Sequence, residues 1–80
     1  MDSDKSVFEL VKYGKIIIDV KSVMDKKKLT INQVVKRTGL HHRNISKYYN
    51  GEVTRFDADT LAKLCFVLEC ELENIMYYKK

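Results

Sequence analysis

The sequence predicts a small all-α domain of about five helices, and three observations support this prediction. The 80 residues are enough for one domain with a single hydrophobic core. Proline is absent and only 3 glycines occur, which favours a helical bundle. Apolar residues recur at helical spacing over most of the chain. The chain ends carry runs of β-branched and aromatic residues, at 14–18 and 75–79, which leave open a short two-strand ribbon.

The clearest helix signals lie in residues 30–51, which read TINQVVKRTGLHHRNISKYYNG. Thr30 is a favourable N-cap residue, and Gln33 completes a capping box with it. Apolar residues then recur on one helical face until Gly39, a residue type that can adopt the left-handed conformation which ends a helix. The sequence therefore predicts a short helix that begins after Thr30 and stops at a tight turn.

A second short helix is predicted over residues 42–49, where Ile45 faces the core and an Asn-Gly pair ends the helix. Two helices joined by a turn of about three or four residues that contains glycine form a helix-turn-helix. In this motif the second helix enters the major groove of DNA. The segment therefore predicts a DNA-binding unit.

The first quarter of the chain gives mixed signals. Residues 1–13 are expected to form an N-terminal arm or a short helix, and the DNA-binding domain is expected to span residues 14–80. The consecutive isoleucines of residues 14–18 favour a strand, after which Asp19 caps a helix over residues 20–27. The competing interpretation is one longer helix that starts near residue 15.

The C-terminal third reads as a helix over residues 58–68, capped by Asp57, followed by a last helical turn near residues 72–76. Phe56, just before the cap, is expected to pack back on the core. The apolar face of the predicted helix is formed by Leu61, Leu64, Cys65 and Leu68.

Charge is distributed unevenly along the chain, although the net charge of +4 is mild. Residues 26–55 hold eight lysines and arginines against one acid, Glu52. Residues 57–75 hold five acids against one base, Lys63. Because the basic stretch coincides with the predicted helix-turn-helix, we interpret it as a nucleic-acid-binding face rather than an ordinary solvated surface.

Cysteine and histidine content does not indicate a metal site. Cys65 and Cys70 are expected to be buried free thiols, because five residues along one helix place two side chains poorly for a disulfide. His41 and His42 point about 100° apart on a helix, so they do not converge on one ion. No metal ion, cofactor or small-molecule ligand is therefore expected.

Catalysis and membrane insertion are also not expected. The chain has no glycine-rich phosphate loop, no nucleophile motif and little room for a substrate pocket beside its core. No apolar run approaches the ~20 residues of a membrane-spanning helix, and acidic residues interrupt any N-terminal signal pattern. The expected protein is therefore a cytoplasmic, non-enzymatic one.

Several short motifs in a fixed order resemble the Cro/phage-repressor type helix-turn-helix family, also called the XRE family. The matching residues are LT at 29–30, Val34 and Val35, TGL at 38–40, Ile45, NG at 50–51 and DADTLAKLCFVLECELENI at 57–75. The resemblance covers about residues 20–77. It implies a λ-repressor-like five-helix fold.

The resemblance also implies which side chains read DNA. Bases are read mainly by the first, second and sixth residues of the second helix, here His42, Arg43 and Lys47. Arginine and lysine can donate hydrogen bonds to guanine O6 and N7, and histidine can donate or accept one. The flanking or phosphate-contacting residues are expected to be His41, Asn44, Ser46, Asn50, Lys36, Thr54 and Arg55.

The expected function is sequence-specific binding of double-stranded DNA by a transcriptional regulator. The expected type of regulator is a repressor, and a homodimer is a possible state. The alternative is an antitoxin- or anti-repressor-like protein-interaction module, since one fold supports several functions. The outward residues of the second helix separate the two, because an interaction module would present apolar groups there. A third possibility is non-specific nucleic-acid binding.

Overall fold

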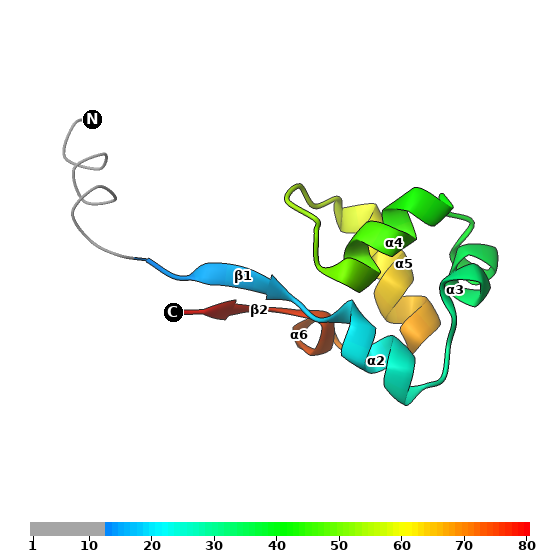
Figure 1. Ribbon diagram of the computed structural model, residues 1–80, viewed down its shortest axis with the longest axis horizontal. Coiled ribbons are helices and arrows are strands. Elements are labelled where there is room, and N and C mark those ends of the chain that lie inside the picture. Colours follow the sequence, from blue (N-terminus) through cyan, green and yellow to red (C-terminus); the bar gives the residue numbers. More distant parts are fainter. Residues whose placement is uncertain (1–12) are drawn as a thin grey trace.

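The computed structural model describes residues 13–80, so that the arm or short helix expected over residues 1–13 falls outside this range except for Tyr13. Five helices and two strands follow in these residues (Figure 1). Their order is β1 (Lys15–Ile18), α2 (Val20–Lys26), α3 (Ile31–Thr38), α4 (His42–Asn50), α5 (Ala58–Leu68), α6 (Leu72–Ile75) and β2 (Met76–Lys79).

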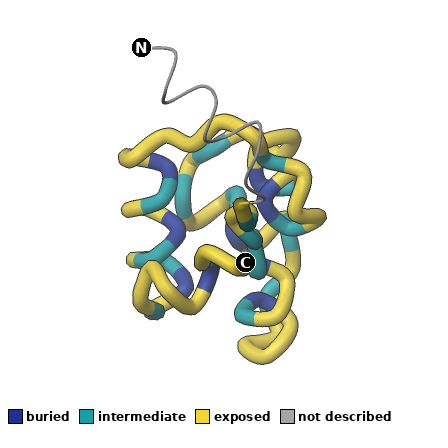
Figure 2. Tube along the Cα trace, turned by 90° about the vertical axis from the view of Figure 1, so that its left-hand side faces the viewer, coloured by how far each residue is buried: buried dark blue, intermediate teal, exposed yellow. Residues whose placement is uncertain are grey.

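Every helix contributes at least one fully or almost fully buried side chain to a single core (Figure 2). Helix α4 lies against both α2 and α3, and α3 also contacts α5. The buried apolar residues are Val20, Met24, Val34, Ile45, Tyr48, Leu64, Leu68 and Ile75. Because these apolar residues recur three or four positions apart on α2, α4 and α5, the amphipathic spacing of the sequence accounts for most of the core.

The predicted helix starts are confirmed by hydrogen bonds. The Thr30 hydroxyl accepts from the Gln33 amide at 3.1 Å, and the Gln33 side chain accepts from the Thr30 amide at 2.8 Å. Asp19 caps α2 through the Ser22 amide, and Asp57 caps α5. Helix α2 ends one residue earlier than predicted, and α4 extends one residue further.

Strands β1 and β2 form an antiparallel ribbon from the two ends of the domain, with Ile16 opposite Tyr78 and Ile18 opposite Met76. The ribbon extends away from the helical body (Figure 1). This confirms a strand, rather than a longer helix, before α2. The all-α class was therefore not fully right: consecutive β-branched residues lose side-chain freedom in a helix and fit a strand better.

Two other expectations need correction. Phe56 was expected to pack on the core but is 39% exposed, because the extended cap residue Asp57 keeps this segment at the surface while Val53 packs inward. Cys65 and Cys70 are free thiols, as expected, but they are only half-buried.

Candidate nucleic-acid interface

The turn between α3 and α4 is held by three hydrogen bonds. Gly39 has φ 75° and donates its amide to the Val35 carbonyl at 2.8 Å. The Thr38 hydroxyl donates to the Val34 carbonyl at 2.7 Å and accepts from the Leu40 amide at 3.2 Å. The left-handed glycine was predicted from the sequence, but this role of Thr38 was not. These bonds define the direction in which α4 leaves the turn.

Helix α4 is fixed to the core by Ile45, which is 0% exposed, and by Tyr48, which is 5% exposed. Burial raises the pKa of the Tyr48 hydroxyl above its ordinary value of 10.0, so the side chain stays neutral at physiological pH. At about 100° per residue, Arg43 and Lys47 fall on the face opposite Ile45. The rotation of α4 about its axis is therefore set by two inward side chains.

The predicted site residues lie at the surface. Their exposed members are His41, His42, Arg43, Asn44, Lys47, Asn50, Lys36, Thr54 and Arg55, whereas Ser46 is half-buried. His41 occupies the N-cap position of α4 but makes no side-chain hydrogen bond to the helix amides. The backbone amides in the first turn of α4 therefore remain available as hydrogen-bond donors to a group outside the helix.

Two hollows flank α4 on opposite sides. One lies between the end of α2, the start of α3 and α4, and it includes His42 and Thr30. The other is lined in part by Asn44, Lys47, Thr54 and Arg55, and so joins the outward face of α4 to the loop after it. Lys36 lines neither of these two hollows and lies on the face of α3 that points away from Val34. The structure thus gathers four of the predicted residues on one side of α4 and places His42 on the other.

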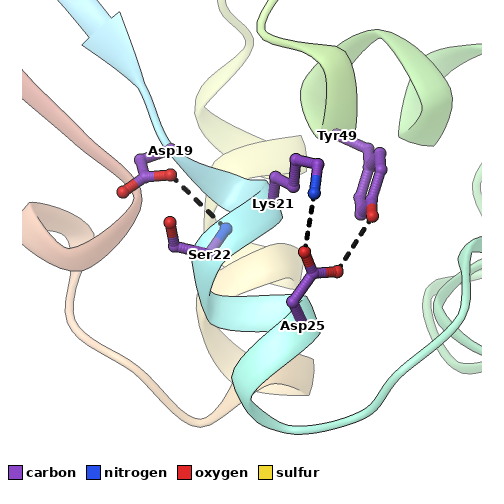
Figure 3. A network of polar contacts seen from close by, with 5 residues as sticks. All are labelled: Asp19, Lys21, Ser22, Asp25 and Tyr49. Carbon is purple, nitrogen blue, oxygen red and sulfur yellow. Dashed lines mark hydrogen bonds and ion pairs between the residues drawn. The ribbon is translucent and has the colours of Figure 1, made fainter.

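A polar network that the sequence did not reveal connects α4 to α2 (Figure 3). The Tyr49 hydroxyl donates to Asp25 at 2.9 Å, and the Lys21 ammonium donates to the same carboxylate at 2.8 Å. The ammonium also lies 5.4 Å from the centre of the Tyr49 ring. The Tyr49–Asp25 bond joins residues 24 positions apart in the chain, so no local pattern could indicate it. These contacts brace α4 beside the first hollow.

This network predicts an acid-dependent loss of stability. The hydrogen bonds from Lys21 and Tyr49 lower the pKa of Asp25 below its ordinary value of 3.8. A carboxyl whose pKa is lowered by folding stabilises the fold above its ordinary pKa, and this contribution is lost as the pH falls through the lowered value. The melting-temperature difference between the native chain and Asp25→Asn should therefore be largest above the ordinary pKa and shrink towards pH 2.

A matched control is Asp59→Asn, which removes an exposed carboxylate paired with Lys63 on the same helix. It should change the melting temperature less than Asp25→Asn, since it connects no two helices. Thermal melts over about pH 2–7 measure both. An Asp25→Asn effect that is constant across this range would contradict stabilisation of the fold by the ionised Asp25 carboxylate.

The cationic side chains of the site form no ion pairs within the described residues. Over residues 13–80 the ion pairs are Lys21–Asp25 and Lys63–Asp59, and neither involves a predicted site residue. The same residues contain no cluster of three or more histidine, cysteine or acidic side chains that could hold a metal ion, and no helix long and apolar enough to cross a membrane. Exposed and unpaired cations beside a polar helix face attract an anionic polymer.

Comparison with known proteins agrees with this geometry. The family of Cro/C1-type helix-turn-helix DNA-binding domains matches residues 20–80. An uncharacterized HTH-type transcriptional regulator of Bacillus subtilis strain 168, YozG, is 30% identical over 64 residues, which are 80% of this chain and 76% of YozG.

A solved structure shares the fold. The crystal structure of a candidate DNA-binding protein from Bacteroides fragilis aligns with a TM-score of 0.68 at 17% identity. The alignment covers 79% of this chain and 100% of that one. The family match spans α2 to β2 and therefore includes the turn, α4 and both flanking hollows. The chain belongs to the Cro/C1-type helix-turn-helix family of DNA-binding domains.

Proposed function

We propose that the protein is a transcriptional regulator, most simply a repressor, that recognises a specific duplex sequence by inserting α4 into the major groove. The observation that carries this proposal is the exposed polar and cationic face of α4, opposite its buried Ile45. The family match and the description of YozG as a transcriptional regulator support it.

The geometry suggests a division of roles. Arg43 and Lys47 lie one turn apart on the outward face, so both reach towards base edges when α4 enters the groove. His42 reads from the flank that faces the start of α3. Arg55 and Thr54 line the same hollow as Lys47. In this proposal they hold a phosphate beside the groove.

The basic stretch predicts a strong dependence of DNA affinity on salt. With about five phosphate contacts, the slope of log affinity against log salt should lie near −4 to −5, because each contact contributes about −0.9. Fluorescence anisotropy on a labelled duplex at about 50–200 mM salt measures it. Lys63→Ala, outside the basic stretch, should leave the slope unchanged. A slope near zero for the native chain would contradict DNA binding.

Selection of bound duplexes from a random pool at physiological salt tests sequence specificity. Enrichment of one motif is the expected result. Binding without enrichment would indicate a non-specific nucleic-acid binder. Absence of binding would favour the competing function, an antitoxin- or anti-repressor-like interaction module, although the polar outward face of α4 does not favour that function.

We also propose that two copies associate through the ribbon. Ile16 and Tyr78 face each other in register and are 47% and 59% exposed, and Tyr77 is 45% exposed on the other ribbon face. Within residues 13–80 each strand pairs only with the other, so each keeps one unpaired edge. A second copy, related by a two-fold axis, can pair with the free backbone groups of such an edge. Dimers of helix-turn-helix proteins read two half-sites about one helical turn apart.

Light scattering after gel filtration tests the association. The native chain should elute as a dimer, and Ile16→Lys should elute as a monomer. Phe66→Lys is the control, because Phe66 is 83% exposed but lies on α5, away from the ribbon. A native chain that stays monomeric at tens of micromolar would rule out this dimer.

A further inference from the structure

The end of α5 brings the two cysteines together. Glu69 adopts a left-handed conformation, with φ 51°, and its amide donates to the Phe66 carbonyl at 3.3 Å. The Cys70 amide donates to the Cys65 carbonyl at 3.1 Å. This pair of bonds is the Schellman motif, which is frequently accompanied by a side-chain contact between the two residues that the outer bond joins. In α5 those two residues are Cys65 and Cys70.

The motif corrects the expectation from spacing. Along a continuous helix, five residues place two side chains about 140° apart and more than one turn distant. Here the left-handed Glu69 reverses the chain between the cysteines, so that they become neighbours across the turn. The argument from spacing holds only for two cysteines on one helix, whereas α5 ends at Leu68 and Cys70 lies beyond the left-handed Glu69.

The thiols are accessible from a common hollow. Both cysteines are half-buried, neither is in a disulfide, and both line a surface hollow together with Arg37 of α3. Burial raises the pKa of the Cys70 thiol, and the neighbouring Cys65 thiol raises it further.

We propose that Cys65 and Cys70 form a dithiol site that a small-molecule disulfide, such as oxidised glutathione, converts into an intramolecular disulfide. One thiol loses its proton and attacks the glutathione disulfide, which forms a mixed disulfide and releases one glutathione. The second thiol then loses its proton and attacks the protein's own sulfur in this mixed disulfide. This step forms the intramolecular disulfide and releases the other glutathione. The two cysteines lose two electrons and two protons, and glutathione disulfide gains them.

The backbone favours the second step. A disulfide needs Cα atoms about 4.4–6.8 Å apart, and a hydrogen bond between the two backbones holds residues 65 and 70 as direct neighbours. Because the motif is already formed in the folded chain, closure orders no further backbone. The site is separate from α4, so it adds a thiol chemistry that DNA binding does not require.

The test equilibrates the full chain in glutathione buffers of different redox ratio, followed by acid quench, maleimide labelling and intact mass measurement. The expected product is lighter by two hydrogen atoms, carries no maleimide and does not migrate as a covalent dimer. Closure should be favoured at least about tenfold more in native buffer than in urea, since folding holds the thiols together. Glutathione adducts on both cysteines, or no advantage of the folded chain, would overturn the proposal.

Variants separate the geometry from simple thiol reactivity. Cys65→Ser and Cys70→Ser should each give only a mixed disulfide with glutathione. Glu69→Gly, which accepts the left-handed conformation, should keep the closure equilibrium of the native chain. Glu69→Val disfavours that conformation and should weaken closure in chains shown to be folded by circular dichroism. Equal closure in folded Glu69→Val and Glu69→Gly would contradict a site built by the Schellman motif.

Discussion

Replacing Ile45 with alanine is expected to lower the free energy of unfolding by ~2–5 kcal/mol, because it removes a large side chain from a closely packed core. Ile45 is 0% exposed and lies in the same cluster as Val34 and Tyr48. The free energy of unfolding of a small domain is only ~5–15 kcal/mol, so this loss would remove a large fraction of it. Urea denaturation followed by circular dichroism measures the loss.

Asn44→Ala provides the control for this experiment. Asn44 precedes Ile45 on α4 but is exposed, so its replacement should change stability by no more than about 0.5 kcal/mol. If both variants unfolded at the same urea concentration, Ile45 would not be the anchor of α4. The helix would then be rotated about its axis, and the assignment of Arg43 and Lys47 to its outward face would fail.

Features set by neighbouring residues could be predicted from the sequence. The capping box of Thr30 and Gln33 and the left-handed Gly39 depend on contacts within a few residues, and both are confirmed. The inward direction of Ile45 follows from helical periodicity in the same way. The order of the helices around the turn could therefore be predicted from the sequence.

Features that depend on tertiary contacts were only partly accessible. The ribbon joins residues about 60 positions apart, and the isoleucine and tyrosine runs suggested it without fixing its register. The bond from Tyr49 to Asp25 could not be predicted, since the two residues are 24 positions apart and no local pattern connects them. The thiol pair was missed because its proximity depends on the backbone conformation of Glu69.

Arg43→Ala is expected to weaken binding to the cognate duplex by ~1–3 kcal/mol, because a bidentate contact from the guanidinium to one guanine is lost. Arg43 is exposed in the first turn of α4, where side chains of this motif reach base edges. The preference at one base pair should relax at the same time. Binding measured against single-base variants of the selected site identifies that pair.

Lys36→Ala is the matched comparison, since it also removes one exposed cation but from α3. A residue that contacts only phosphate should weaken all sequences about equally and lower the salt slope by about one.

The most direct test of DNA reading by α4 is the ratio of affinities for the cognate and a scrambled duplex, measured at one salt concentration for the native chain, Arg43→Ala and Lys36→Ala. The expected result is a ratio that falls about 5- to 150-fold in Arg43→Ala and stays unchanged in Lys36→Ala. If Arg43→Ala weakened both duplexes by the same factor, Arg43 would contact only phosphate, and its proposed role as a base reader would be wrong.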